Sequence, residues 1–248
     1  MRISDVTAAH SIAPLKNVSA LMTLVETLVG RSAGLPGLGV GSGPSGYGKT
    51  VAAQFCQNQL GVTYIEARSF WSSKVFCENL LVELGGRPSG TLAKMMEQII
   101  DRVADLNRPL IIDEADKLVE KRQIELVRDI YETTQVPIIL LGEEELPTKL
   151  AAFERVHNRV LDWVLFQPCD FADTRALAEL ILGRGIHIAD DLIEAVRVKT
   201  SGRTRRVATT LFQVRTFAIQ HGLTAIDQAT YRGKFETGLI PRREQRVG

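Results

Sequence analysis

Eight consecutive residues between a predicted strand and a predicted helix form a phosphate-binding motif. They match G-x-x-x-x-G-K-[S/T], a motif whose glycines let backbone N–H groups turn toward phosphate oxygens. The helix that follows adds its positive N-terminal end. We expect Lys49 to reach the β- and γ-phosphates of ATP and the Thr50 hydroxyl to ligate Mg²⁺. The residues expected to contact the nucleotide in this segment are Gly43, Pro44, Ser45, Gly46, Tyr47, Gly48, Lys49, Thr50 and Val51.

A second motif lies about 60 residues further on, where the apolar run 109–112 ends in Asp113 and Glu114. Ligands bind at the carboxyl ends of strands in open α/β sheets. We therefore expect Asp113 to hold Mg²⁺, directly or through water, and Glu114 to act as the base that activates an attacking water. The alternative is that the two acids cap the next helix.

Phosphoryl transfer to water also needs positive charge near the γ-phosphate. Arg155 and Arg159 precede a predicted strand, and Arg205 opens a predicted helix. These three arginines are candidates for that charge. The alternative for each is a surface ion pair that contributes little to stability.

Predicted strands alternate with predicted helices up to about residue 168. Because the central strands are apolar on both faces, the pattern indicates a parallel five-stranded sheet sandwiched by helices, an α/β fold. The predicted strands are 38–42, 62–67, 109–113, 136–141 and 161–166. The predicted helices are 17–29, 49–60, 73–84, 91–105 and 120–133.

Beyond residue 168 the periodicity is that of helices alone, over 173–182, 190–199, 203–220 and 224–232. We expect a nucleotide-binding domain at 1–170, including an N-terminal helical segment, and a small all-helical lid domain at 171–248. The lid would end in a basic C-terminal tail with Arg242, Arg243 and Arg246, which we expect to fray.

Composition sets limits on the class of protein. The chain has 248 residues, 45% of them hydrophobic and 24% charged, and a formal net charge of +1. These are ordinary globular values, and no apolar run reaches the length of a membrane span. Three widely spaced cysteines predict reduced, mostly buried thiols. Residues 171–248 carry 13 basic and 8 acidic side chains, against 17 and 21 in the rest, so the predicted lid could attract phosphates.

The phosphate loop, the acidic strand end, the arginine before the fifth strand and the helical domain with Gly202-x-x-Arg205 resemble, in this order, the AAA+ ATPases. The resemblance implies ATP and Mg²⁺ as cofactors and self-assembly into a ring or a helical filament. It implies that Arg159, or else Arg155, completes the site of a neighbouring subunit. It also implies that Arg205, or else Arg206, contacts nucleotide bound to its own chain. One position departs, because Glu143 follows the fourth strand where many relatives place Asn, Thr or Ser; with its acidic neighbours it suits the start of a helix instead.

Within the AAA+ ATPases, the stretches 108–118, 123–150 and 154–160 are similar to the transposition regulators, the group of the phage Mu B protein and the TnsC, TniB and IstB proteins. The group implies a cytoplasmic protein, in a bacterium or a phage-infected cell. Its partners would be duplex DNA and a transposase, with no membrane. The segment after the second strand then faces DNA, so Arg68 and Lys74 are candidates for backbone contact, and Lys94 is a further one. Phe70 and Trp71 of this segment could instead pack in the core.

Two other functions stay open from the sequence. A helicase loader of the DnaC type shares most of these motifs and would prefer single-stranded DNA. An ATPase that acts as a switch on other proteins is the second alternative. A nucleotide kinase would need an acceptor site, and no motif in the chain marks one.

Overall fold

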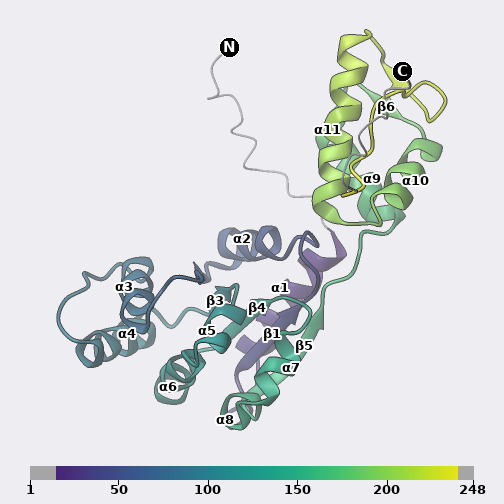
Figure 1. The fold of residues 1–248 in the computed structure, drawn as a ribbon. Coiled ribbons are helices and arrows are strands. Elements are labelled where there is room, and N and C mark those ends of the chain that lie inside the picture. Colours follow the sequence, from purple (N-terminus) through teal and green to yellow (C-terminus); the bar gives the residue numbers. More distant parts are fainter. Residues whose placement is uncertain (1–14, 240–248) are drawn as a thin grey trace, which may run out of the picture. The chain divides into compact units, whose positions relative to one another are not determined.

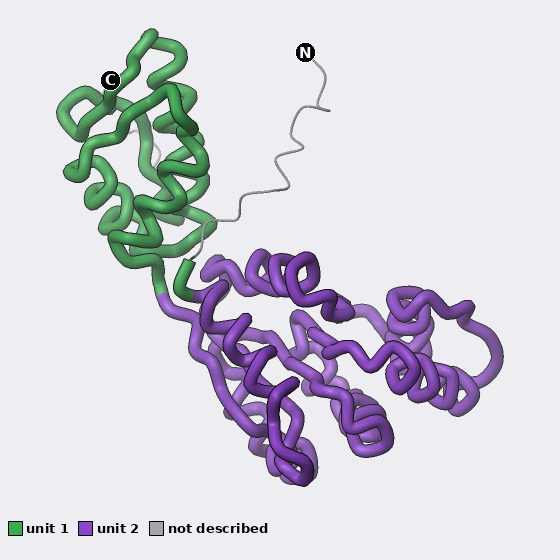
Figure 2. The backbone as a smooth tube through the Cα atoms, turned by 180° about the vertical axis from the view of Figure 1, so that it is seen from behind, with its two compact units in different colours: residues 1–16, 168–248 green, residues 17–167 purple. Residues whose placement is uncertain are grey.

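The computed structural model of the protein describes residues 15–239, and its chain divides into two compact units (Figure 2). The larger unit comprises residues 17–167. The smaller comprises residues 168–239 together with 15 and 16. Arg242, Arg243 and Arg246, the basic tail expected from the sequence, lie outside the described residues.

A five-stranded parallel sheet forms the centre of the larger unit (Figure 1). Its strand order is β2-β3-β4-β1-β5, and every neighbouring pair is parallel. The expected α/β fold is therefore confirmed. The strands are β1 (Leu38–Ser42), β2 (Thr63–Glu66), β3 (Leu110–Asp113), β4 (Ile138–Gly142) and β5 (Val160–Leu165).

The two faces of the sheet are covered by different helices. Side chains alternate between faces along a strand. Leu38 and Val40 belong to the core cluster shared with the helices from α3 (Ser73–Glu83) to α8 (Glu154–His157). Gly39 points to the opposite face, where a Cβ would meet Leu24 and Leu28 of α1 (Lys16–Val29). Helices α1 and α2 (Lys49–Leu60) cover this second face. Strands β1, β3 and β4 are buried throughout, which explains their unbroken apolar sequences.

The helices of the larger unit agree with the predicted ranges except between 115 and 157. The predicted helix 120–133 begins later, at Ile124, and a short helix that was not predicted ends at Glu120 just before it; Arg122, with a positive φ of 57°, lies in the turn between the two. Two further short helices precede β5. The helices are α1 (Lys16–Val29), α2 (Lys49–Leu60), α3 (Ser73–Glu83), α4 (Leu92–Leu106), α5 (Asp116–Glu120), α6 (Ile124–Thr134), α7 (Leu146–Ala151) and α8 (Glu154–His157).

The smaller unit is built on three helices, α9 (Phe171–Leu182), α10 (Asp190–Lys199) and α11 (Thr204–Gln220). It is helical as expected, with one addition: strands β6 (His187–Ile188) and β7 (Ala225–Ile226) pair in parallel. The expected helix 224–232 is wrong for this reason. After β7, the Asp227 carboxylate accepts a 2.7 Å hydrogen bond from the Thr230 backbone N–H, which forms a turn.

Cys56, Cys77 and Cys169 are buried and none is in a disulfide. No helix within residues 15–239 combines the length and the apolar character needed to cross a membrane.

Candidate nucleotide site

The phosphate loop lies between β1 and α2, as its motif requires (Figure 1). Gly46 and Gly48 adopt positive φ angles of 86° and 85°, a conformation that costs residues with a Cβ about 1–2 kcal/mol. At Gly43 a Cβ would lie 2.8 Å from the Cβ of Phe166. The three glycines are therefore needed for the turn and the close packing that place the loop at the N-terminus of α2, the end of a helix that attracts anions.

Lys49 is the first residue of α2 and is buried. Its Nζ donates hydrogen bonds to the carbonyl oxygens of Gly43, at 2.6 Å, and Pro44, at 3.3 Å. Burial lowers the pKa of the Lys49 ammonium, and the nearby Asp113 and Glu114 carboxylates oppose this effect. The ammonium group is thus held inside the loop where a phosphate would bind.

Asp113 is fully buried at the end of β3 and accepts three hydrogen bonds. The Thr50 hydroxyl donates to its Oδ2 at 2.7 Å, and the Tyr64 hydroxyl donates to the same oxygen at 3.1 Å. The Glu114 backbone N–H donates to Oδ1 at 2.9 Å. A hydroxyl and a carboxylate side by side beneath a phosphate loop are the protein donors that Mg²⁺ needs when nucleotide phosphates complete its shell.

Glu114 follows directly and lies partly buried beside this carboxylate. Its φ of 55° is in the left-handed region, which residues other than glycine rarely adopt. Burial raises the pKa of the Glu114 carboxyl, and the adjacent Asp113 charge raises it further. Strained backbone and a raised pKa are common at catalytic positions.

Asn17, in the first turn of α1, braces the loop from outside, although no sequence motif marks it. Its side-chain amide donates to the carbonyl oxygens of Tyr47, at 3.1 Å, and Gln167, at 2.7 Å. The Gln167 backbone N–H donates back to Asn17 Oδ1 at 3.0 Å. One buried side chain thus links the phosphate loop to the segment that leaves β5.

Glu143 follows β4, which lies between the strands that end in the phosphate loop and in Asp113. Its backbone N–H donates a 2.6 Å hydrogen bond to Oδ2 of the buried Asp116. The Glu143 charge raises the pKa of both Lys49 and Glu114. The helix expected near Glu143 begins at Leu146, and Glu143 itself stays at the sheet edge.

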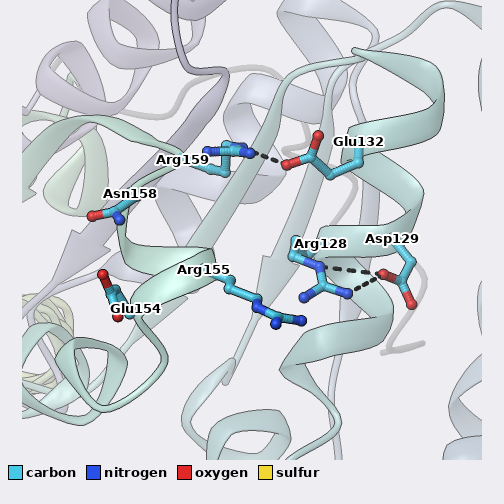
Figure 3. Close-up of a pocket in the computed structure, with 7 residues that line it drawn as sticks. All are labelled: Arg128, Asp129, Glu132, Glu154, Arg155, Asn158 and Arg159. Atoms are coloured by element: carbon cyan, nitrogen blue, oxygen red, sulfur yellow. Dashed lines mark hydrogen bonds and ion pairs between the residues drawn. The ribbon is translucent and has the colours of Figure 1, made fainter.

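Arg155 and Arg159 line one surface pocket of about 590 Å³ with Arg128 (Figure 3). Arg159 forms an ion pair with Glu132 of α6. Arg155 forms no ion pair with any described residue. The structure thus brings the two candidate arginines together, and only Arg159 of the two is held by a carboxylate of the described chain.

Arg205 and Arg206 lie in the first turn of α11, in the smaller unit. Arg205 is exposed and makes no ion pair within the described part of the chain. Arg206 instead donates a 2.7 Å hydrogen bond to the Thr237 carbonyl oxygen. Of the two, Arg205 is the side chain available to a ligand.

The segment after β2 forms an exposed loop, residues 67–72, that leads into α3. Its aromatic residues differ: Trp71 is 7% exposed and packs in the core, whereas Phe70 is 77% exposed. Lys121 Nζ and Gln123 Nε2 fix the loop by donating hydrogen bonds to the Trp71 carbonyl oxygen, at 2.8 and 3.3 Å.

Several basic side chains are exposed on this loop and on the segments beside it. Arg68 and Lys74 are exposed, and among the described residues Lys74 has one ion pair, with Glu78 at 3.9 Å. Arg122, which belongs to no sequence motif, is exposed beside Lys121. Lys94 lies in the first turn of α4, and no described hydrogen bond or ion pair joins it to this loop.

Comparison with protein families gives a match, and it covers most of this site. Residues 33–150, which include the phosphate loop, β3 with its acids and β4, match the family described as an AAA domain. The fold is that of the AAA+ ATPases. No curated protein sequence matches the chain.

Solved structures share this fold. The Orc1 protein of Aeropyrum pernix, determined in complex with DNA, aligns with a TM-score of 0.60 and 18% identity over 86% of this chain and 62% of its own. Cdc6p from Pyrobaculum aerophilum aligns with a TM-score of 0.62 and 13% identity over 89% of this chain and 66% of its own. The chain thus spans less than two thirds of the length of either protein.

Proposed function

We propose that the protein is a Mg²⁺-dependent ATPase. The observation that carries the proposal is the pairing of Thr50 with the buried Asp113 directly below the phosphate loop. Mg²⁺ would be held by these two groups and would neutralise charge on the β- and γ-phosphates. Lys49 would exchange its two loop carbonyls for phosphate oxygens, which are stronger partners for an ammonium ion.

Glu114 is the proposed base. Its carboxylate takes a proton from a water molecule as the water oxygen bonds to the γ-phosphorus, and ADP leaves with the bridging oxygen. A pKa raised above the ordinary glutamate range brings the carboxylate nearer to the basicity this step needs. Glu143 would add negative charge to the site, since it raises the pKa of both Lys49 and Glu114, and this charge favours slow turnover.

Arginines with two different roles would complete the site. We propose that Arg155, and to a lesser extent Arg159, contacts the ATP of a neighbouring subunit, since Arg159 would first have to leave Glu132. Arg205 would contact nucleotide bound to its own chain. ATP then stabilises the assembly of subunits into a ring or filament, and hydrolysis loosens it.

The proposed partner of this assembly is duplex DNA. Arg68, Lys74, Lys121 and Arg122 present cations on two segments that hydrogen bonds hold together. Such a surface suits contact with the phosphate backbone, and phosphate contacts do not distinguish one base from another. Binding should therefore be independent of DNA sequence and weakened by salt.

The biological role we propose is that of a cytoplasmic transposition regulator, which holds target DNA and activates a transposase. It rests on the sequence resemblance described above. A helicase loader is the second candidate, and the exposed Phe70 favours it, because a free aromatic ring can stack on an unpaired base.

Fluorescence anisotropy with duplex and single-stranded DNA over a range of salt concentrations tests the DNA surface. With ATP present, we expect duplex affinity to fall steeply as the salt concentration rises. Arg68→Ala and Arg122→Ala should each reduce the slope of log affinity against log salt concentration by about 1, because each removes one phosphate contact. Arg102→Ala, an exposed arginine of α4, is the control and should change nothing. A slope of zero would contradict the proposal, and tighter binding to single strands would favour the loader.

A further inference from the structure

Tyr64 is a polar side chain of the nucleotide site to which the proposed mechanism assigns no role. It lies in β2, in register with Ile111 of β3, two residues before the pair formed by Glu66 and Asp113. Alternation along the strands puts Tyr64, Ile111 and Asp113 on the face of the sheet opposite the core cluster of α3 to α8. That is the face covered by α2, which carries Thr50.

The three donors to Asp113 leave its carboxylate little freedom. A carboxylate offers about four acceptor positions. Oδ2 uses two of them for Thr50 and Tyr64, and Oδ1 uses one for the Glu114 N–H. Asp113 is fully buried, so water cannot replace a lost donor at low cost.

These donors differ in what nucleotide binding would do to them. Under the proposed function, the Thr50 oxygen turns to the metal and the Glu114 backbone is tied to the base. Tyr64 alone lies on a neighbouring strand with no other role. The Tyr64 hydroxyl can therefore keep its hydrogen bond to Oδ2, and so hold this oxygen in place, when the Thr50 oxygen binds the cation.

We propose that Tyr64 is a positioning residue for the metal. It orients the Asp113 carboxylate for Mg²⁺ without touching the nucleotide. This inference rests on the proposed ATPase function. Groups that orient metal ligands in this way typically change metal affinity or activity by about 10- to 100-fold when removed.

The test compares full-length Tyr64→Phe with wild type by electron paramagnetic resonance titration of Mn²⁺ in the presence of a non-hydrolysable ATP analogue. We expect Mn²⁺ affinity to fall about 10- to 100-fold, with metal-free nucleotide affinity, measured in EDTA, unchanged. Tyr231→Phe is the matched control, since its hydroxyl donates at 2.8 Å to the Lys234 carbonyl in the smaller unit. It should bind Mn²⁺ as wild type does.

A second measurement separates positioning from a general loss of structure. Mg²⁺ demands near-ideal octahedral geometry, whereas Ca²⁺ tolerates irregular sites. Competition against Mn²⁺ should therefore show a larger loss for Mg²⁺ than for Ca²⁺ in Tyr64→Phe, and equal losses would overturn the inference. Wild-type Mn²⁺ affinity in Tyr64→Phe would also overturn it while leaving the ATPase proposal intact. Absence of Mn²⁺ binding by wild type would overturn both.

Discussion

The Thr50 hydroxyl donates a 2.7 Å hydrogen bond to Oδ2 of Asp113, a residue 63 positions later in the chain. The bond joins the N-terminus of α2 to the carboxyl end of β3. The protein's own fold therefore makes the two groups proposed to hold Mg²⁺ adjacent, and nucleotide binding does not have to assemble them. Preorganisation of this kind lowers the cost of binding.

Removal of the Thr50 hydroxyl should weaken Mg²⁺ binding. Thr50→Val keeps the side-chain shape and leaves Asp113 with one donor fewer, so we expect Mg²⁺ affinity to fall by about 10- to 100-fold. Thr50→Ser keeps the hydroxyl and should remain within a few-fold of wild type. Hydrolysis rates over a Mg²⁺ titration measure both variants, and equal behaviour of the two would remove Thr50 from the metal site.

Glu114→Gln should lose activity and gain stability. Without the base, hydrolysis should slow by on the order of 10²–10⁴-fold while ATP binding persists. In wild type the raised pKa of Glu114 means that its folded environment favours the protonated form. Its contribution to stability is therefore lost as pH rises through that pKa, and at pH 7 its charge is a cost that Gln removes.

The stability half of this prediction has its own measurement. The nucleotide-free Glu114→Gln protein should melt at a higher temperature than wild type at pH 7, and the gap should close below about pH 4.3, the ordinary glutamate value. Glu120→Gln should change stability in the opposite direction. A hydrogen bond from Lys149 lowers the pKa of Glu120, so this variant should be slightly less stable at pH 7. Full turnover by Glu114→Gln would remove Glu114 from the role of base.

The arginines of the pocket in Figure 3 should differ in importance. If Arg155 acts on the nucleotide of a neighbouring subunit, Arg155→Ala should bind ATP normally and hydrolyse it about 10³-fold more slowly. Arg159→Ala should lose less, because Glu132 already holds its guanidinium. Arg128→Ala is the control, since Glu125 and Asp129 engage Arg128.

A mixing experiment decides whether the arginine acts between subunits. We expect Lys49→Ala protein to lose ATP binding but still to offer an intact Arg155. Its addition to Arg155→Ala protein should therefore restore part of the hydrolysis rate. If no mixing ratio restores activity, Arg155 does not act across an interface.

A glycine in the smaller unit gives a prediction on stability alone. Gly202 has a φ of 63°, and a Cβ there would lie 2.7 Å from the Cys169 carbonyl oxygen. Gly222 has the same φ, but a Cβ at that position would have no neighbouring atom within 4 Å. Gly222→Ala should therefore cost about 1–2 kcal/mol of backbone strain, and Gly202→Ala that amount plus the overlap. Chemical denaturation measures both, and equal losses would contradict the packing described for Gly202.

Much of the fold could be predicted because its signals are local. The phosphate loop and the apolar strand before Asp113 indicate their own conformations, and the predicted ranges of all five strands lie within two residues of the observed ends. The errors occur where tertiary contacts determine the secondary structure. Ala225–Ile226 has a helical pattern, but pairing with His187–Ile188 makes it a strand.

The site was predictable only for residues inside a motif. Lys49, Thr50, Asp113 and Glu114 are each marked by their sequence neighbours. Asn17, Tyr64 and Asp116 are not, because each acts through a hydrogen bond to a residue at least 27 positions away. The local sign for Tyr64 is its spacing: Tyr64 and Glu66 lie two residues apart in β2, so they share the face of the sheet that carries Asp113.

The mechanism proposed here requires ATP to drive assembly of this protein on duplex DNA. Electron microscopy of the purified protein with linear duplex DNA, in parallel with a slowly hydrolysed ATP analogue, with ADP and without nucleotide, can show that assembly. We expect rings or filaments on DNA with the ATP analogue alone, and none for Lys49→Ala. Discrete particles that ignore duplex DNA in all three conditions would contradict the claim.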